Sequence, residues 1–333
     1  MKSLFIGDKN NIDYVFSDAI KLQLSDVAAL RADLVLTRDD FAENKSVLRE
    51  CDTVFTSWGF PTLSKDELAE YLPNLKAVFY AAGSVQYFAK DFIETGIKVF
   101  SAWGANAVPV AEYTLAQILL ANKGFYGASR LMKAENHTAA AEYFGKYPGN
   151  YNCNVGIIGA GMIGKLVIRL LKSYKISTLV FDPFLPKSTA DELGVRLVTL
   201  PELFKSCQTI SNHLSNNAQT AHMLNYELFS SMKPHATFIN TGRGRQVVES
   251  DLCHALAERP DLTALLDVTD PEPSATGHPF YALPNVVLTP HIAGSSGQEV
   301  GRMAEYMLEE FLKHKSGQPT SYEVTLKMLE TMA

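Results

Sequence analysis

Residues 154–164 read N-V-G-I-I-G-A-G-M-I-G, and this stretch decides how the chain is expected to fold. An apolar run is followed by Gly159, Gly161 and Gly164, so a buried strand is expected to turn tightly into a helix. Glycines at this spacing allow the turn, let the backbone approach a pyrophosphate and let the helix pack close to its strand. The same spacing also occurs in ordinary turns, so its interpretation depends on the surrounding sequence.

A second apolar run, 178–181, supports a dinucleotide-binding unit because it ends at Asp182. In such units an acidic residue roughly 20 positions beyond the glycines accepts a hydrogen bond from a ribose 2'-hydroxyl. An Asp-Pro turn at Asp182 and Pro183 is the alternative explanation for the carboxylate.

The composition is that of an ordinary globular protein. The 333 residues, 47% hydrophobic and 20% charged, are enough for two domains. A formal net charge of −6 argues against nucleic acid as a partner, and the four widely spaced cysteines are expected to be reduced. Because the sequence shows no signal-peptide pattern and no apolar run of about 18 residues, we expect no membrane span and a cytoplasmic location.

Short apolar runs alternate with helix-like stretches along the chain, which predicts an α/β fold with parallel sheets covered on both faces. The strands expected before the glycine turn are 4–6, 34–37, 53–56, 77–80 and 98–100. Those expected from the turn onward are 155–158, 178–181, 196–198, 209–212, 237–240, 263–268 and 286–289. The second set is large enough for a complete dinucleotide-binding sheet.

Helix signals lie between these strands. Ser64 begins an S-x-x-E capping box, and a long apolar helix is expected over 105–122 with Pro109 in its first turn. The polar stretch 127–152 has no strand signal and is interpreted as an arm or a linker, and a last amphipathic helix is expected over 297–315.

Three motifs at expected strand ends carry side chains suited to chemistry. N-T-G-R-G places Arg243 in a glycine-flanked turn, and a guanidinium suits a carboxylate or carbonyl oxygen. L-D-V-T-D-P-E-P holds Glu272 between two prolines, and T-P-H-I-A-G ends a strand with His291. Taken singly, the three are also typical of a surface arginine, a solvated acidic loop and an ordinary histidine, of which the chain has eight.

Ala82, Gly83 and Ser84 follow the fourth expected strand, where ligands of open parallel sheets bind. Their backbone N–H groups could hold a carboxylate, although an ordinary small-residue turn would have the same sequence. No two histidines have the spacing of a metal-binding pair, so we expect no metal site.

The glycine turn and these three motifs, in this order, resemble the D-isomer-specific 2-hydroxyacid dehydrogenase family, and the match runs from about residue 81 to 297. The resemblance implies two doubly wound parallel-sheet domains. A Rossmann cofactor domain, 102–293, would be inserted in a flavodoxin-like substrate domain formed by 1–101 and 294–333.

The resemblance also implies roles for individual residues. Arg243 would bind the substrate carboxylate and carbonyl, His291 would be the acid and base, and Glu272 would hold His291 and favour its protonated form. Backbone N–H groups of Ala82, Gly83 and Ser84 would hold the carboxylate. The implied cofactor-binding residues are Gly159, Gly161, Met162, Ile163, Gly164, Asp182, Thr241 and Asp267.

Asp182 favours NAD over NADP, because its charge would repel a 2'-phosphate and no arginine follows within 183–187. Lys187 is the residue that would favour NADP. The family is commonly dimeric through its cofactor domain, so a homodimer is expected, with the arm 127–152 exchanged between subunits.

The chain departs from the family pattern at three places. H-L-S at 213–215 replaces the frequent H-x-P-L, and the stretches 56–59 and 83–87 lack the arginine and aspartate typical of phosphoglycerate-acting members. No regulatory domain is expected after Lys315. These features, with Trp58 and Tyr87, favour a small non-phosphorylated 2-keto acid, as in glyoxylate or hydroxypyruvate reductases. An NADH-sensing corepressor-like binding protein and a phosphoglycerate dehydrogenase-like enzyme are the alternatives.

Overall fold

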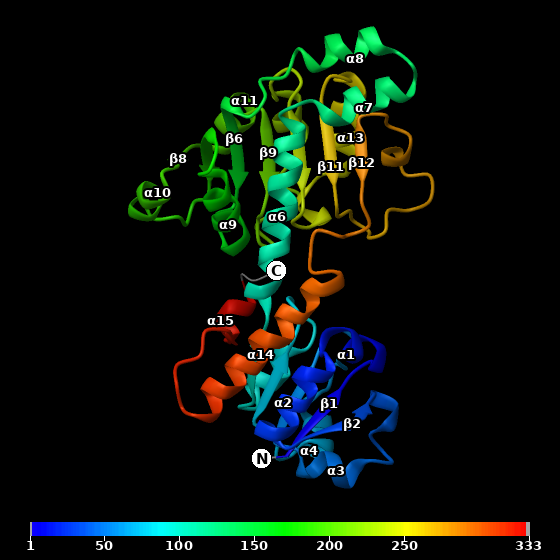
Figure 1. Cartoon of the computed structure of the whole chain (residues 1–333), viewed down its shortest axis with the longest axis vertical. Coiled ribbons are helices and arrows are strands. Elements are labelled where there is room, and N and C mark those ends of the chain that lie inside the picture. The colour runs from blue at the N-terminus through cyan, green and yellow to red at the C-terminus, as the bar shows by residue number, and fades with distance from the viewer. Residues whose placement is uncertain (1, 331–333) are drawn as a thin grey trace. The chain divides into compact units, whose positions relative to one another are not determined.

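The computed structural model describes residues 2–330, which form two compact units (Figure 1). One unit contains the residues up to Asn106 together with those from Ser295 onward, and the other runs from Ala107 to Gly294. Each unit is built on one twisted sheet with helices packed against it. The predicted α/β class, with two doubly wound sheets, is confirmed.

The sheet of the first unit has six strands in the order β13-β5-β4-β3-β1-β2. The parallel strands are β1 (Ser3–Ile6), β2 (Leu30–Leu36), β3 (Thr53–Thr56), β4 (Ala77–Tyr80) and β5 (Lys98–Ser101), and β13 (Glu323–Val324) is antiparallel. The helices are α1 (Lys9–Val15), α2 (Asp18–Ala28), α3 (Lys45–Glu50), α4 (Lys65–Tyr71), α5 (Ala89–Glu94), α14 (Val300–Lys315) and α15 (Leu326–Leu329). The order 2-1-3-4-5 of the parallel strands is that of a flavodoxin-like fold.

Buried aromatic rings join the end of the chain to its beginning in this unit. Phe55 on β3 and Phe79 on β4 stack with their ring centroids 5.3 Å apart, and Phe311 of α14 packs edge-on against both. The expected capping box is present at Ser64, whose hydroxyl accepts the N–H of Glu67 at the start of α4.

The sequence did not predict β13, because contacts distant in sequence create it. The Glu310 side chain is fully buried, and its Oε2 accepts the N–H groups of Ser321 at 2.8 Å and Tyr322 at 2.9 Å. This carboxylate turns the chain so that two residues pair with β5. A two-residue strand has no detectable periodicity.

The second unit contains a seven-stranded parallel sheet in the order β12-β11-β10-β9-β6-β7-β8. Its strands are β6 (Tyr151–Ile158), β7 (Lys175–Phe181), β8 (Arg196–Leu197), β9 (Thr209–Asn212), β10 (Thr237–Asn240), β11 (Thr263–Leu266) and β12 (Val286–Leu288). Its helices are α6 (Trp103–Ala121), which enters this unit at Ala107, and α7 (Phe125–Lys133), α8 (His137–Phe144), α9 (Met162–Leu171), α10 (Lys187–Leu193), α11 (Leu200–Ser206), α12 (Tyr226–Ser230) and α13 (Glu249–Glu258). Short 3-10 turns are η1 (Arg38–Asp40) and η4 (Gly297–Glu299) in the first unit, and η2 (Gly244–Gln246) and η3 (Pro279–Tyr281) in the second. All the strands predicted from the glycine turn onward are present.

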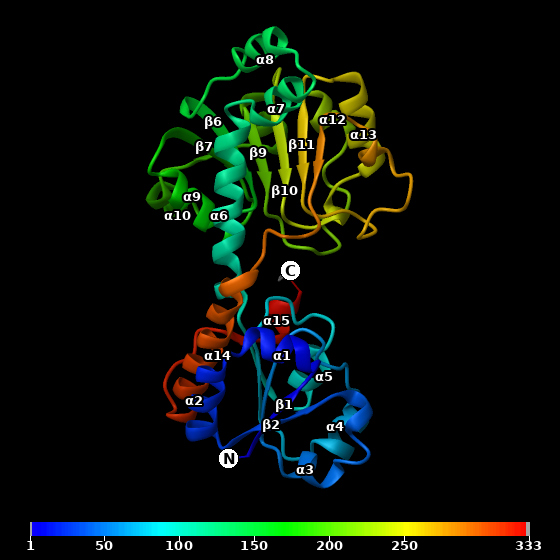
Figure 2. The same cartoon turned by 45° about the vertical axis from the view of Figure 1, so that its right-hand side comes forward.

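Alternate residues of these strands face two separate hydrophobic clusters. Ile157 on β6 belongs to the cluster formed with α6, α9 and α10, whereas its neighbour Ile158 belongs to the cluster formed with α11, α12 and α13. The same alternation separates Ile239 from Phe238 on β10. Figure 2 shows α6 crossing in front of this sheet.

The strand order reverses between β6 and β9, because β7 and β8 continue to one side of β6 and β10 to β12 to the other side of β9. In open parallel sheets, ligands bind beyond the carboxyl ends of the strands at such a reversal. The glycine turn follows β6 at this point.

One expectation about the segment before β6 was wrong. Pro109 lies well inside α6 rather than in its first turn, because the helix already begins at Trp103. The stretch 127–152, interpreted as an arm or a linker, contains most of α7 and all of α8, which pack against each other: a Cβ added to Gly127 would lie only 2.2 Å from Cζ of Tyr143. Among residues 2–330, no helix combines the length and hydropathy that crossing a membrane requires.

Candidate active site

The glycine turn after β6 uses each of its glycines differently. Gly159 has a φ of +86°, and a Cβ there would lie 2.7 Å from the carbonyl oxygen of His213. A Cβ on Gly164 would lie 2.1 Å from the carbonyl oxygen of Gly159, whereas one on Gly161 would meet nothing within 4 Å. The turn and the close helix packing therefore need the outer glycines, and the space beside Gly161, at the start of α9, is free for a ligand.

The Asp182 carboxylate lies at the end of β7 and is held by backbone groups. Its Oδ2 accepts the N–H of Ala160 in the glycine turn at 2.8 Å, and its Oδ1 accepts the N–H of Phe184 at 2.9 Å. Asp182 therefore stabilises the Asp-Pro turn that follows it and also lies next to the glycine turn, so the two explanations of this carboxylate do not exclude each other.

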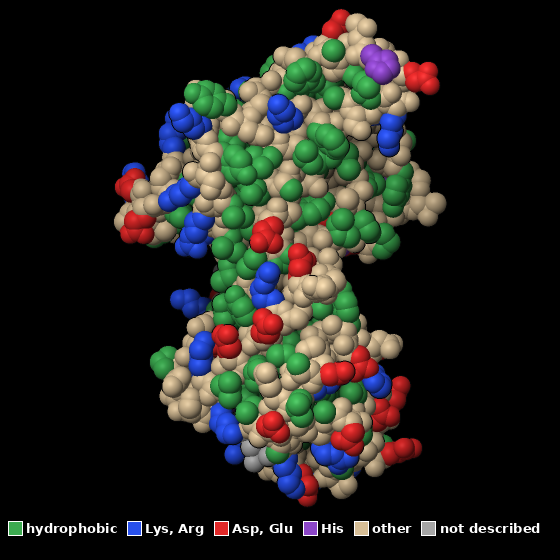
Figure 3. Space-filling model, in the orientation of Figure 1, with side chains coloured by type: hydrophobic (Ala, Val, Ile, Leu, Met, Phe, Trp, Pro, Cys, Tyr) green, Lys and Arg blue, Asp and Glu red, His purple; other side chains and the backbone are tan. Residues whose placement is uncertain are grey.

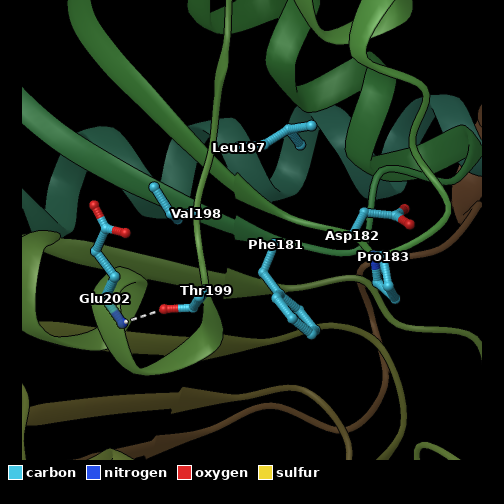
Figure 4. A pocket seen from close by; sticks show the side chains of 7 residues that line it. All are labelled: Phe181, Asp182, Pro183, Leu197, Val198, Thr199 and Glu202. Atoms are coloured by element: carbon cyan, nitrogen blue, oxygen red, sulfur yellow. Dashed lines mark hydrogen bonds between the residues drawn. The ribbon is translucent and has the colours of Figure 1, made fainter.

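A pocket of about 380 Å³ lies beside Asp182, between the ends of β7 and β8 and the start of α11 (Figure 4). Its lining is mainly apolar and comprises Phe181, Asp182, Pro183, Leu197, Val198, Thr199 and Glu202. The Thr199 hydroxyl caps α11 by accepting the N–H of Glu202 at 3.3 Å. A flat apolar group could therefore lie next to the Asp182 carboxylate.

Arg243 lies in the turn after β10, where its Nη1 donates to the carbonyl oxygen of Gly242 at 2.8 Å. Burial lowers the pKa of Arg243 from its usual value, and the negative charge of Glu272 opposes this effect. A Cβ on Gly244 would lie 2.0 Å from the carbonyl carbon of Thr269. Only glycine allows the arginine turn to pack so closely against the acidic loop that carries Glu272.

His291 and Glu272 are in direct contact, with Nδ1 and Oε1 2.6 Å apart. Because a carboxylate only accepts hydrogen bonds, Nδ1 carries the proton and a neutral ring presents Nε2 as an acceptor. Within residues 2–330 no other group hydrogen-bonds this ring. The two side chains are 45% and 38% exposed, so a small molecule can reach the pair.

Asp267 holds the loop that carries His291. Its buried carboxylate accepts the Thr289 hydroxyl at 2.6 Å and the N–H groups of Ile292 and Ala293, both at 2.9 Å. The His291 N–H also donates to the carbonyl oxygen of Asp267 at 3.0 Å. His291 itself has a φ of +55°, a left-handed conformation that these bonds maintain.

Thr241 is also buried, and its hydroxyl lies 3.2 Å from that of Thr114 on α6. Thr289 was not predicted as a site residue, although it stands two positions before His291. Tyr113 was also missed, and its hydroxyl lies 3.2 Å from that of Thr289. No short-range pattern marks either residue, since their partners are distant in sequence.

Ala82, Gly83 and Ser84 belong to the first unit. The Ser101 hydroxyl donates to the carbonyl oxygens of Ala82 at 2.9 Å and Gly83 at 2.5 Å. Within residues 2–330, the N–H groups of Gly83 and Ser84 donate no backbone hydrogen bond, so they are available to an anion.

His213, at the end of β9, is a buried neutral histidine. Burial lowers its pKa to about 3, its Nε2 lies 2.9 Å from the Ser211 hydroxyl, and its Nδ1 has no hydrogen-bond partner. In the described part of the chain, no group of three or more His, Cys, Asp or Glu side chains is arranged to hold a metal ion.

The fold and these residues define a Rossmann-type dinucleotide-binding unit with Arg243, Glu272 and His291 on neighbouring loops. The sequence model of the "D-isomer specific 2-hydroxyacid dehydrogenase, NAD binding domain" matches residues 115–293, more than half of the chain. The protein therefore belongs to the D-isomer-specific 2-hydroxyacid dehydrogenase family.

Two curated relatives illustrate the match. A glyoxylate reductase of Korarchaeum cryptofilum is 30% identical over 292 residues, which cover 86% of this chain and 87% of the relative. A D-3-phosphoglycerate dehydrogenase of Methanocaldococcus jannaschii is 29% identical over 307 residues, covering 90% of this chain but 56% of the relative. The chain thus spans about half the length of that phosphoglycerate dehydrogenase.

Solved structures share the fold at low identity. D-mandelate dehydrogenase of Rhodotorula graminis superposes with a TM-score of 0.80 at 19% identity, over 97% of both chains. A D-2-hydroxyisocaproate dehydrogenase gives 0.77 at 21% identity, over 98% of this chain and 100% of the other.

Proposed function

We propose that the protein reduces a small non-phosphorylated 2-keto acid to the D-2-hydroxy acid, with NADH as the reductant. The observation that carries this proposal is the 2.6 Å contact between His291 and Glu272, whose charge acts on the half-buried Arg243. A histidine oriented by a carboxylate can give a proton to a developing alkoxide and take it back in the reverse reaction.

His291 is the proton donor in the reducing direction. Glu272 accepts a hydrogen bond from the Nδ1–H of His291, so Nε2 is directed to the substrate and is the atom that delivers the proton. After transfer from Nε2 to the substrate oxygen, the ring remains in the tautomer that the Glu272 contact selects.

Arg243 binds the substrate carboxylate and the carbonyl oxygen. Its guanidinium is half-buried, and the donors not used by Gly242 form a planar fork that matches two oxygens.

The described residues fit NAD. The open space at Gly161 suits a pyrophosphate, with Met162 and Ile163 at the helix start, and Asp182 suits the adenine ribose. Asp267 and Thr241 would face the nicotinamide half. When bound, NADH supplies the hydride that reduces the keto carbon. The negative charge of Asp182 supports NAD rather than NADP.

The first unit supports a substrate without phosphate. Neither 56–62, after β3, nor 81–89, after β4, contains lysine or arginine, although both follow carboxyl ends of the sheet where a substrate group would bind. Half-buried Trp58 and the exposed ring of Tyr87 offer apolar surface instead. Several relatives are named phosphoglycerate dehydrogenases, so that activity is the second candidate.

A panel of substrates separates these candidates. NADH oxidation is measured with glyoxylate, hydroxypyruvate, pyruvate, phenylpyruvate and 3-phosphohydroxypyruvate. We expect at least one non-phosphorylated acid to exceed 3-phosphohydroxypyruvate in kcat/KM by about tenfold or more. A preference for the phosphorylated acid would favour the second candidate, and NADH binding without any turnover would favour a corepressor-like sensor.

We also propose a homodimer formed through the second unit. Leu120, Phe125, Met132 and Phe144, around α7 and α8, are exposed large apolar side chains. Figure 3 shows hydrophobic side chains on the face that carries α6 and α7, and such surface is typical of an interface. Light scattering should give twice the chain mass, and a monomer would contradict the dimer.

The free cysteines, whose pKa values burial raises, suit a cytoplasmic protein.

A further inference from the structure

Three buried side-chain amides lie together beside the Arg243 turn. Asn212 ends β9, Asn240 ends β10, and Gln246 is in η2; their exposed fractions are 0%, 1% and 0%. The Nδ2 of Asn212 donates to Oδ1 of Asn240 at 3.0 Å and to Oε1 of Gln246 at 2.6 Å. None of the three was expected as a site residue from the sequence.

Gln246 uses all of its hydrogen-bonding capacity. Its Oε1 accepts the N–H of Arg243 at 3.2 Å in addition to the Asn212 amide. Its Nε2 donates to the carbonyl oxygens of Leu214 at 2.7 Å and Ser215 at 3.0 Å. Buried polar groups are costly when left unpaired, so these bonds strongly favour one position of the Arg243 turn relative to residues 214–215.

Asn240 holds the other side of the same turn. Its Nδ2 donates to the carbonyl oxygen of Arg243 at 3.1 Å, and its Oδ1 accepts the N–H of Gly242 at 3.1 Å. The backbone of Arg243 is therefore fixed at its N–H by Gln246 and at its carbonyl by Asn240.

The second partner of Gln246, the segment 214–215, adjoins the glycine turn. The residue before it, His213, packs against the glycine turn: its carbonyl oxygen would lie 2.7 Å from a Cβ added to Gly159. Gln246 thus connects the Arg243 turn to the strand end that borders the proposed pyrophosphate space. A displacement of either segment would break bonds to the other.

We propose that Gln246 is a positioning residue: its amide oxygen fixes Arg243 for the substrate, and its amide nitrogen fixes the 214–215 segment for the dinucleotide. This inference rests on the proposed function for the role of Arg243. It goes beyond that function because it links the oxygen of one buried amide to substrate binding and the nitrogen of the same amide to dinucleotide binding.

Two substitutions separate the halves. Gln246→Met keeps the length of the side chain and removes every hydrogen bond. Gln246→Glu keeps an oxygen that accepts from Arg243 but loses the donor to Leu214 and Ser215. The matched control is Asn285→Leu, because the 5% exposed amide of Asn285 donates to the carbonyl oxygens of Leu256 and Leu262, both at 3.0 Å, away from these motifs.

Amide hydrogen exchange, read by mass spectrometry over residues 240–247, tests the positioning without any turnover. We expect Gln246→Met to speed exchange at Gly242 and Arg243 by about tenfold or more, as loss of about 1.4 kcal/mol of local stabilisation would. Gln246→Glu should leave these amides slow, and Asn285→Leu should do the same.

Ligand binding tests the two assignments. Gln246→Met should raise both the NADH Kd and the KM for the best keto acid about tenfold, whereas Gln246→Glu should raise chiefly the NADH Kd. Unchanged exchange and unchanged NADH affinity in Gln246→Met, with a fall in melting temperature like that of Asn285→Leu, would overturn the proposal. Wild-type protein that binds NADH but reduces no acid would instead overturn the proposed function, and the exchange result would still stand.

Discussion

His291 Nδ1 lies 2.6 Å from Glu272 Oε1, although the two residues are 19 positions apart and come from different loops. The buried Asp267 carboxylate holds the His291 loop, and the packing of Gly244 against Thr269 holds the Glu272 loop. Contacts of these two loops with Asp267 and Gly244 therefore place the proposed proton-transfer pair, which makes the effects of individual substitutions predictable.

Replacement of His291 should abolish most turnover while the cofactor still binds. His291→Ala removes the proposed proton donor, and we expect kcat to fall by about 10² to 10⁴. The NADH Kd, measured by fluorescence, should change less than threefold. His254→Ala is the control, because His254 is an exposed histidine paired with Glu258 on α13. Wild-type kcat in His291→Ala would remove this residue from the chemistry.

Thr289 should matter through its hydroxyl group. Thr289→Val keeps the shape of the side chain but loses the 2.6 Å bond to Asp267, so the His291 loop becomes less constrained. We expect kcat to fall about tenfold, equivalent to about 1.4 kcal/mol. Thr289→Ser retains the hydroxyl and should retain most of the rate. Equal rates for the valine and serine variants would show that the bond does not position His291.

Asp182 should determine which dinucleotide is preferred. Asp182→Asn removes the negative charge that would repel a 2'-phosphate, and we expect the ratio of NADPH to NADH Kd to fall about tenfold or more. Asp191→Asn, at an exposed carboxylate on α10, controls for the loss of one surface charge. An unchanged ratio would mean that other residues select the cofactor.

His213 should make the second unit sensitive to acid. Burial lowers its pKa from 6.5 to about 3, so below pH 6.5 the unfolded chain binds a proton that the folded chain does not. Stability is then lost as the pH falls, by at most about 1.4 kcal/mol per pH unit from this residue. Above pH 6.5 the residue contributes no pH dependence.

Urea unfolding between pH 4.5 and 7.5 checks this sign. The decrease in unfolding free energy at acid pH should be smaller in His213→Gln than in the wild type. The exposed control His137→Gln should show the same decrease as the wild type. The same acid dependence in all three proteins would mean that His213 is protonated in the folded state.

Much of the second sheet could be predicted from the sequence, because each strand is a local apolar run bounded by turn residues. The spacing of the glycine turn was equally readable, since Gly164 is required by its contact with Gly159, five residues away, whereas the contact of Gly159 with His213 is distant in sequence. By contrast, β13 depends on Glu310, and the role of Asp267 in holding the His291 loop depends on Thr289. No local pattern records such pairings between distant segments.

The buried amides show the same limit more strongly. Asn212, Asn240 and Gln246 have no periodicity or spacing in common, and asparagine at a strand end is equally typical of a turn. Only the three-dimensional arrangement shows that their amides bond one another and enclose the Arg243 turn.

The central claim is tested most directly by the chirality of the product. The purified protein is incubated with NADH and its best 2-keto acid from the panel, and the hydroxy acid is resolved by chiral chromatography. We expect NADH oxidation to match product formation one to one, with the D-isomer as the product and with loss of both signals in His291→Ala. Formation of the L-isomer, or no product while NADH binds tightly, would contradict the account.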